Sequence, residues 1–150
     1  MNNNKKHVYV FYGAPKTGKT DITEFMRADI FHGRPDVTVT RPSSKKCLII
    51  DCIDGKDLIK GLSDLVGPIT TADLRNNDYI WAILHAPHKN IILIVNDAVS
   101  DYYEELVNRS ISCAEEFCER ALSLFGDEMV VSLVNFKAIE MESDNNGGTR

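Results

Sequence analysis

The sequence lacks an apolar run approaching the roughly 20 residues that a helix needs to cross a bilayer, and its polar first six residues contain no signal-peptide core. Its four cysteines form no CxxC pair, so we expect free thiols in a reducing compartment rather than disulfides or a Cys/His zinc site. With a net charge of -5, it also lacks the basic excess of a broad duplex-DNA-binding face. We therefore expect a soluble intracellular protein, in which a few basic residues still suffice to line a narrow channel.

The 150 residues suit one compact domain, which we place at 7–141, between a polar linker over 1–6 and a disordered polar tail over 142–150. Strands alternate with helices along it, and this order predicts a three-layer α/β domain with a mostly parallel sheet. The expected strands cover 7–12, 37–41, 47–51, 91–95 and 129–136.

The helices follow from apolar residues at helical spacing and from capping residues. One helix is expected from Gly18 to about Phe31, and an amphipathic one over 56–66. Two more are expected before the last strand, the first capped by Asp101 and the second by Ser112. Residues 69–90 fit either a β-hairpin or a short helix over 72–85.

A complete G-x-x-x-x-G-K-[ST] pattern lies between the first expected strand and the first expected helix. In such a phosphate loop the backbone N–H groups point at the phosphates, and the helix N-terminus adds positive potential. Lys19 would contact the β- and γ-phosphates, and the Thr20 hydroxyl would bind Mg²⁺. The pattern therefore predicts binding of ATP with Mg²⁺ by the loop Gly13, Ala14, Pro15, Lys16, Thr17, Gly18, Lys19 and Thr20.

Asp51 closes the apolar run CLIID and is placed like a Walker B acid, which holds Mg²⁺. Many ring-forming ATPases place a second acid directly afterwards to polarise the attacking water, but here that position is Cys52, and a neutral thiol is a poor base. Asp54 is the nearby substitute, and it fits a helix cap before Gly55 equally well.

Two further polar residues are candidates for catalysis. Asn96 ends the run IILIV, where an amide can orient the lytic water, although an Asn-Asp turn also fits. Arg120 lies on the last expected helix, where an isolated arginine is most often a surface residue.

Together these motifs resemble the superfamily 3 helicase domain of the replication-initiator proteins of small circular single-stranded DNA viruses, such as circoviruses. The resemblance covers roughly His7 to Phe136 and includes Asn96 as the sensor asparagine. Its motifs are HVYVFYGAPKTGKT, CLIID, ITTADLRNNDYIWAILHAPHKN, IILIVN and CAEEFCERALSLF.

The resemblance implies an ATPase of the AAA+/superfamily 3 type that assembles into a hexameric ring and moves single-stranded DNA through its pore. It implies DNA contacts by Arg75 and Lys89. It also implies an arginine finger at Arg120, with Arg109 as a weaker candidate, and a location in the host nucleus if the protein comes from a eukaryotic virus.

The chain departs from that family at Cys52, in lacking a Lys-Gly-Gly hairpin tip, and in lacking the HUH and Tyr-x-x-Lys motifs of the nicking half. It is therefore expected to be an excised domain or a small relative without that half. Two other classes stay open: a nucleotide-binding module with little turnover, and a small nucleotide kinase, although no arginine-rich lid is evident.

Overall fold

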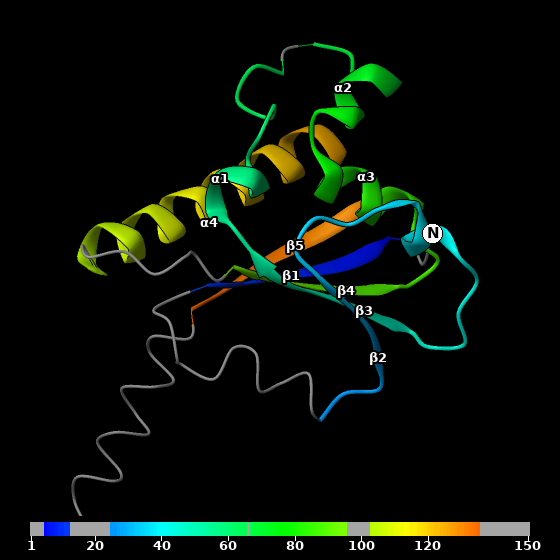
Figure 1. Cartoon of the computed structure of the whole chain (residues 1–150). Helices are drawn as coiled ribbons and strands as arrows, with labels where there is room; N and C mark the ends of the chain where they lie inside the picture. Colours follow the sequence, from blue (N-terminus) through cyan, green and yellow to red (C-terminus); the bar gives the residue numbers. More distant parts are fainter. Residues whose placement is uncertain (1–4, 13–24, 66, 96–102, 136–150) are drawn as a thin grey trace, which may run out of the picture.

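A computed structural model describes residues 5–12, 25–65, 67–95 and 103–135 (Figure 1). The phosphate loop Gly13 to Thr20 and Asn96 lie outside these residues, so the predictions for them remain predictions. Within the described part, no helix is both long and apolar enough to cross a bilayer.

The described strands form one five-stranded sheet in which all neighbouring strands run parallel. The strand order is β2-β3-β4-β1-β5, so β4 lies between β1 and β3 (Figure 1). The strands are β1 (Lys6–Tyr12), β2 (Ala28–His32), β3 (Cys47–Ile53), β4 (Asn90–Val95) and β5 (Met129–Asn135). The α/β class and four of the expected strands are confirmed.

Two expected elements near the edge of the sheet are wrong. The first helix was expected to reach Phe31, but Ala28–His32 is the edge strand β2, which pairs with β3. The expected strand over 37–41 is the 3₁₀ helix η2 (Val37–Thr40), whose first turn is capped by the Asp36 side chain accepting a hydrogen bond from the Thr38 N–H. In both places a partner set the conformation against the local apolar pattern: the backbone of β3 in the first, and a side-chain cap in the second.

The helices between β3 and β4 are shorter than expected. Helix α1 (Gly55–Leu58) covers only the start of the predicted 56–66 helix. Gly61 follows at φ +78, where a Cβ would come within 2.5 Å of the Asn76 Cβ, so this close turn requires glycine. Two short helices, α2 (Thr71–Arg75) and α3 (Asp78–His85), occupy the uncertain segment, so its hairpin alternative is wrong.

A single 23-residue helix, α4 (Tyr103–Phe125), precedes β5 where two helices were expected. The helix passes through Ser112 without a break, so Ser112 is not a cap, but the predicted end near Phe125 is confirmed. Figure 1 shows α1, α3 and α4 on the same side of the sheet.

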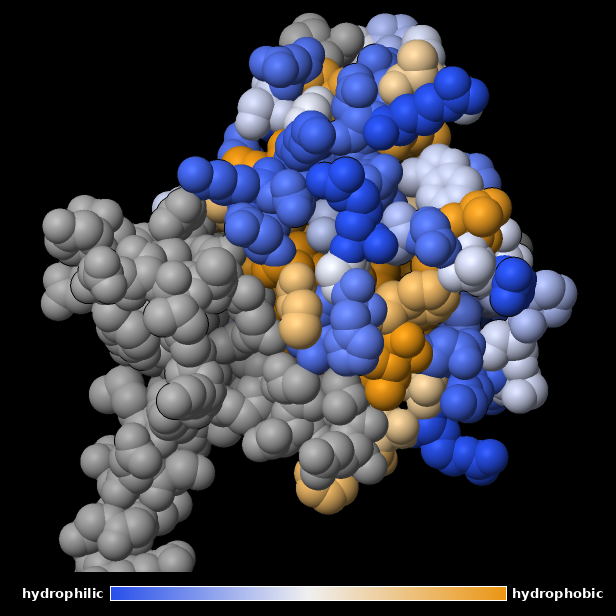
Figure 2. All heavy atoms as spheres, viewed as in Figure 1, coloured by the Kyte–Doolittle hydropathy of each residue, from blue (hydrophilic) through white to orange (hydrophobic). Residues whose placement is uncertain are grey.

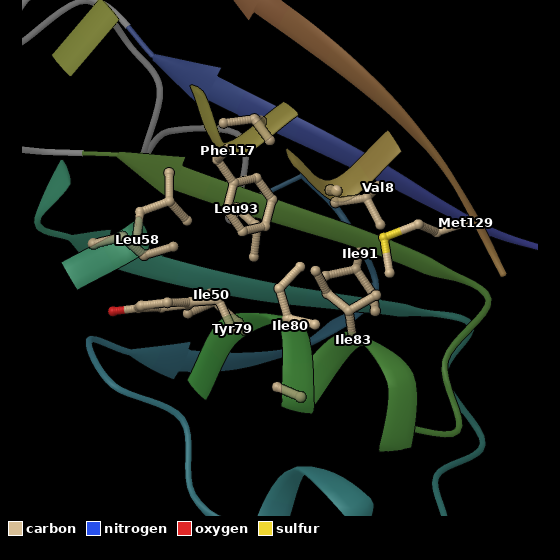
Figure 3. Close-up of a cluster of buried hydrophobic side chains, with 14 of the residues drawn as sticks. Val8, Ile50, Leu58, Tyr79, Ile80, Ile83, Ile91, Leu93, Phe117 and Met129 are labelled. Carbon is tan, nitrogen blue, oxygen red and sulfur yellow. The ribbon is translucent and has the colours of Figure 1, made fainter. Parts of the chain in front are cut away.

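The larger apolar core lies between the sheet and these helices. Phe117 of α4 is fully buried and lies against Leu93 of β4, and Ile80 and Ile83 of α3 approach Ile91 (Figure 3). Alternate residues of the strands belong to a second apolar cluster, which includes Phe11, Ile49, Ile92 and Ile94. Both sets are buried, as expected for a parallel sheet.

The face shown in Figure 2 is mostly hydrophilic over α1 and α2, with apolar side chains exposed between and below the polar ones. Phe25 and Val37 are among the large apolar side chains that remain exposed, at 83% and 69%. Beneath this surface, the apolar core between the sheet and α1, α3 and α4 positions the site.

Candidate functional site

The candidate site lies at the edge of the sheet where the parallel strands end. Because the strands share one direction, the ends of β1, β4, β3 and β2 lie along the same edge. Ligands of open α/β sheets bind in the crevice outside such carboxyl ends. Tyr12 ends β1 directly before the phosphate-loop pattern, and Val95 ends β4 directly before Asn96. Asp51 lies two residues before the end of β3 and so shares this edge.

Asp51 is the buried acid of the site, with a relative exposure of 1%. Its Oδ1 accepts a hydrogen bond from the Cys52 backbone N–H at 2.8 Å. Its backbone carbonyl accepts another from the Gly33 N–H at 2.6 Å. The first contact orients the carboxylate on the backbone of the next residue, and the second ties the backbone of β3 to the loop that follows β2.

His32 lies beside Asp51 on the neighbouring strand. The two residues are register partners in the pairing of β2 with β3. The imidazole Nδ1 lies 4.0 Å from Asp51 Oδ2, and the His32 side chain is 70% exposed. A histidine and a carboxylate therefore lie side by side where β2 and β3 end.

Cys52 takes an unusual backbone conformation. Its φ is +60, a value that favours glycine, and the register with β4 shifts between Ile50 and Ile53. Its exposed thiol lies with His32 and Asp51, and the potential ligand atoms of the three residues are within 4.8 Å of one another. Desolvation by burial, and secondarily the Asp51 charge, raise the pKa of the Cys52 thiol. The thiol is therefore protonated at neutral pH, which makes it a poor general base.

Asp54 caps the helix that follows. Its Oδ1 accepts a hydrogen bond from the Lys56 N–H at 2.9 Å, at the start of α1. The helix-cap interpretation of Asp54 is thus confirmed, while its catalytic role stays a prediction.

The loop after β2 is tied to α1 and α3 by Arg34. Its guanidinium lies 3.2 Å from an Asp78 oxygen and 3.8 Å from an Asp57 oxygen. Tyr79, the residue after Asp78, is buried, and this burial together with the Asp57 charge raises the pKa of its phenol to about 12. Sequence reasoning missed both His32 and Arg34, because the only signal there was a presumed helix end with Gly33 and Pro35.

Arg120 lies far along α4 from this edge. The helix begins after β4 ends and leads to the start of β5, so it runs against the strand direction. At 1.5 Å per residue, Arg120 is about 25 Å along the helix axis from Tyr103. Its Nη2 donates a long hydrogen bond, 3.5 Å, to the Ser63 carbonyl. Arg120 therefore does not join Asp51 and His32 where the strands end.

The two residues expected to contact DNA occupy different elements. Arg75 is exposed at the end of α2. Lys89 is exposed just before β4, at the edge where strands begin, and its carbonyl accepts a hydrogen bond from the His7 N–H. Asn90, its neighbour, donates to the carbonyl of Lys46, so Lys46 and Lys89 lie close together along that edge.

Comparisons of this chain with protein-family models, with curated proteins and with solved structures find no match.

Proposed function

We propose that the chain is an ATP-binding and ATP-hydrolysing domain of the superfamily 3 helicase type that acts on single-stranded DNA. The observation that carries the proposal is the order of the strand ends. The strand before the phosphate-loop pattern and the strand bearing Asp51 flank β4, which leads to Asn96. This order supports a site with the loop on one side, the acid on the other and an amide between them.

Each residue then has a distinct role. The backbone of Gly13 to Thr20 cradles the phosphates, and Lys19 balances their charge. Asp51 and Thr20 would hold Mg²⁺, and the ion would supply neutralisation of the phosphate charge. A carboxylate oxygen suits Mg²⁺, and the buried, hydrogen-bonded position of Asp51 keeps that oxygen at the strand end. Asn96 orients the attacking water.

Calorimetry of Mg-ATP binding tests the central step. Lys19→Ala is expected to weaken affinity at least about 10-fold, since each 1.4 kcal/mol of lost interaction is tenfold in affinity. Lys46→Ala is the matched control, because Lys46 is an exposed lysine that precedes β3 at the opposite edge of the sheet. Equal affinity in the wild type and Lys19→Ala would remove the proposal.

A second candidate function is a nucleotide-binding module with little turnover. It is favoured by Cys52, since a protonated thiol stands where a water-polarising acid is expected. ATP turnover with and without single-stranded DNA separates the two functions. A helicase domain is stimulated by DNA, whereas a binding module stays inactive in both conditions, and phosphoryl transfer to an acceptor would instead indicate a kinase.

Assembly completes the proposed mechanism. Arg120 lies along α4 away from the edge where β1 ends, and in this proposal it acts on ATP bound by a neighbouring subunit. A hexameric ring provides such neighbours and a pore for single-stranded DNA, with Lys89 and Arg75 as its proposed contacts. The mass of the assembly with ATP and Mg²⁺ present, measured by light scattering, tests the ring directly: a monomer at all concentrations contradicts it.

A further inference from the structure

Three side chains with different donor atoms meet where β2 and β3 end. They are the imidazole of His32, the carboxylate of Asp51 and the thiol of Cys52, with potential ligand atoms within 4.8 Å of one another. We propose that these three residues form a site for Zn²⁺.

The donor set decides the kind of metal. Mg²⁺ and Ca²⁺ prefer oxygen ligands, whereas a nitrogen, a sulfur and one carboxylate oxygen suit Zn²⁺. Catalytic and exchangeable zinc sites use three protein ligands and leave a further position open. His32 and Cys52 are both exposed, so an ion can enter from solvent and keep a water as its fourth ligand.

Backbone geometry also points to a built site. Successive residues of a strand normally point to opposite faces of the sheet. Here the positive φ of Cys52 and the register shift beside it bring the thiol into one group with the carboxylate of the preceding residue. Bulges and residues in sparsely populated conformations commonly serve to re-aim a side chain at a functional site.

The distances require only a small adjustment. Ligands about 2.0–2.3 Å from a tetrahedral zinc ion lie roughly 3.5 Å from one another. The His32 and Asp51 atoms are 4.0 Å apart and all three ligand atoms lie within 4.8 Å of one another, so rotation of the exposed imidazole and thiol can close the difference. Asp51, held by the Cys52 N–H, supplies the fixed point of the site.

One consequence rests on the proposed function. Asp51 is also the proposed Mg²⁺ ligand, so Zn²⁺ at this site would compete for the acid and inhibit ATP turnover. Removal of Zn²⁺ by a chelator would then restore activity.

Cobalt spectroscopy with the full chain tests the site: Co²⁺ that binds Cys52 displaces the thiol proton to solvent, and the bound thiolate gives a charge-transfer absorption. We expect that band with the wild type, its loss on adding Zn²⁺, and no effect of excess Mg²⁺ on the band without nucleotide. Cys52→Gly, which suits the positive φ, should abolish the band, and His32→Gln should weaken Zn²⁺ affinity at least about 10-fold by calorimetry. Cys47→Ala, at the opposite end of β3, should keep both properties.

Three results would overturn the site: no thiolate band at saturating Co²⁺, a band that survives in Cys52→Gly, or equal Zn²⁺ affinity in His32→Gln and wild type. Lys19→Ala separates this proposal from the proposed function, because the phosphate loop contributes no zinc ligand. Zn²⁺ binding should persist in Lys19→Ala whether or not that variant loses ATP, and its loss there would contradict the three-residue site.

Discussion

His32 and Asp51 are register partners on adjacent parallel strands, and the imidazole Nδ1 of one lies 4.0 Å from the carboxylate oxygen of the other. The acid at the end of β3 thus has an exposed histidine on one side and the strand that leads to Asn96 on the other. The edge strand β2 therefore contributes to the candidate site, although its sequence suggested part of a helix.

Cys52, the residue after the acid Asp51, limits the rate of ATP hydrolysis in the proposed mechanism. Cys52→Glu should raise kcat by about 10²–10⁴-fold, the usual contribution of a well-placed general base, because the wild-type thiol is protonated at neutral pH. Steady-state ATPase assays measure this change, and Cys52→Gln controls for side-chain size. Unchanged turnover in Cys52→Glu, together with loss of activity in Asp54→Ala, would identify Asp54 as the base.

Arg120→Ala should keep ATP affinity and lower turnover by about 10³–10⁵-fold, the range that an arginine finger contributes. Specific activity of the wild type should also rise with protein concentration, since the finger must come from a neighbour. Mixing Lys19→Ala with Arg120→Ala subunits should restore part of the activity. Loss of turnover in Arg109→Ala but not in Arg120→Ala would assign the finger to Arg109.

Phe117→Ala should lower the free energy of unfolding by about 3–5 kcal/mol, because it empties a fully buried position between α4 and the sheet. Leu122→Ala, on the same helix but 47% exposed, should cost much less. Urea titrations of both variants measure the difference. Similar losses would mean that α4 does not pack on the sheet through Phe117.

The buried phenol of Tyr79 should make the folded protein less stable at alkaline pH. Burial raises its pKa from 10.0 to about 12 in the folded protein, so folding favours the neutral phenol. Its contribution is complete below pH 10 and falls as the pH rises from about 10 to 12. The difference in unfolding free energy between the wild type and Tyr79→Phe, measured by denaturant titration, should therefore change in favour of Tyr79→Phe across this range. A constant difference would contradict the shifted pKa.

Much of the sheet was predictable because its central strands are continuous apolar runs. CLIID and IILIV have no helical periodicity, are short and end at polar residues, and both form strands buried on two faces. The segment ADIFH was not predictable in this way, since its apolar residues also fit the end of a helix. Helix α4 was divided in the prediction because a local capping pattern at Ser112 outweighed the continuous helical face.

For the candidate site, the sequence by itself determined the phosphate-loop pattern, the strand-ending acid Asp51 and the unusual thiol at Cys52, because each is a local pattern of neighbouring residues. Only the tertiary structure decided that His32 pairs with Asp51, that β4 lies between β1 and β3, and that Cys52 turns toward the acid. Strand pairing joins segments that are distant in the chain, and its energy comes from backbone hydrogen bonds and packing across the sheet. Those partners, and the backbone conformation that they impose, are absent from any local stretch of sequence.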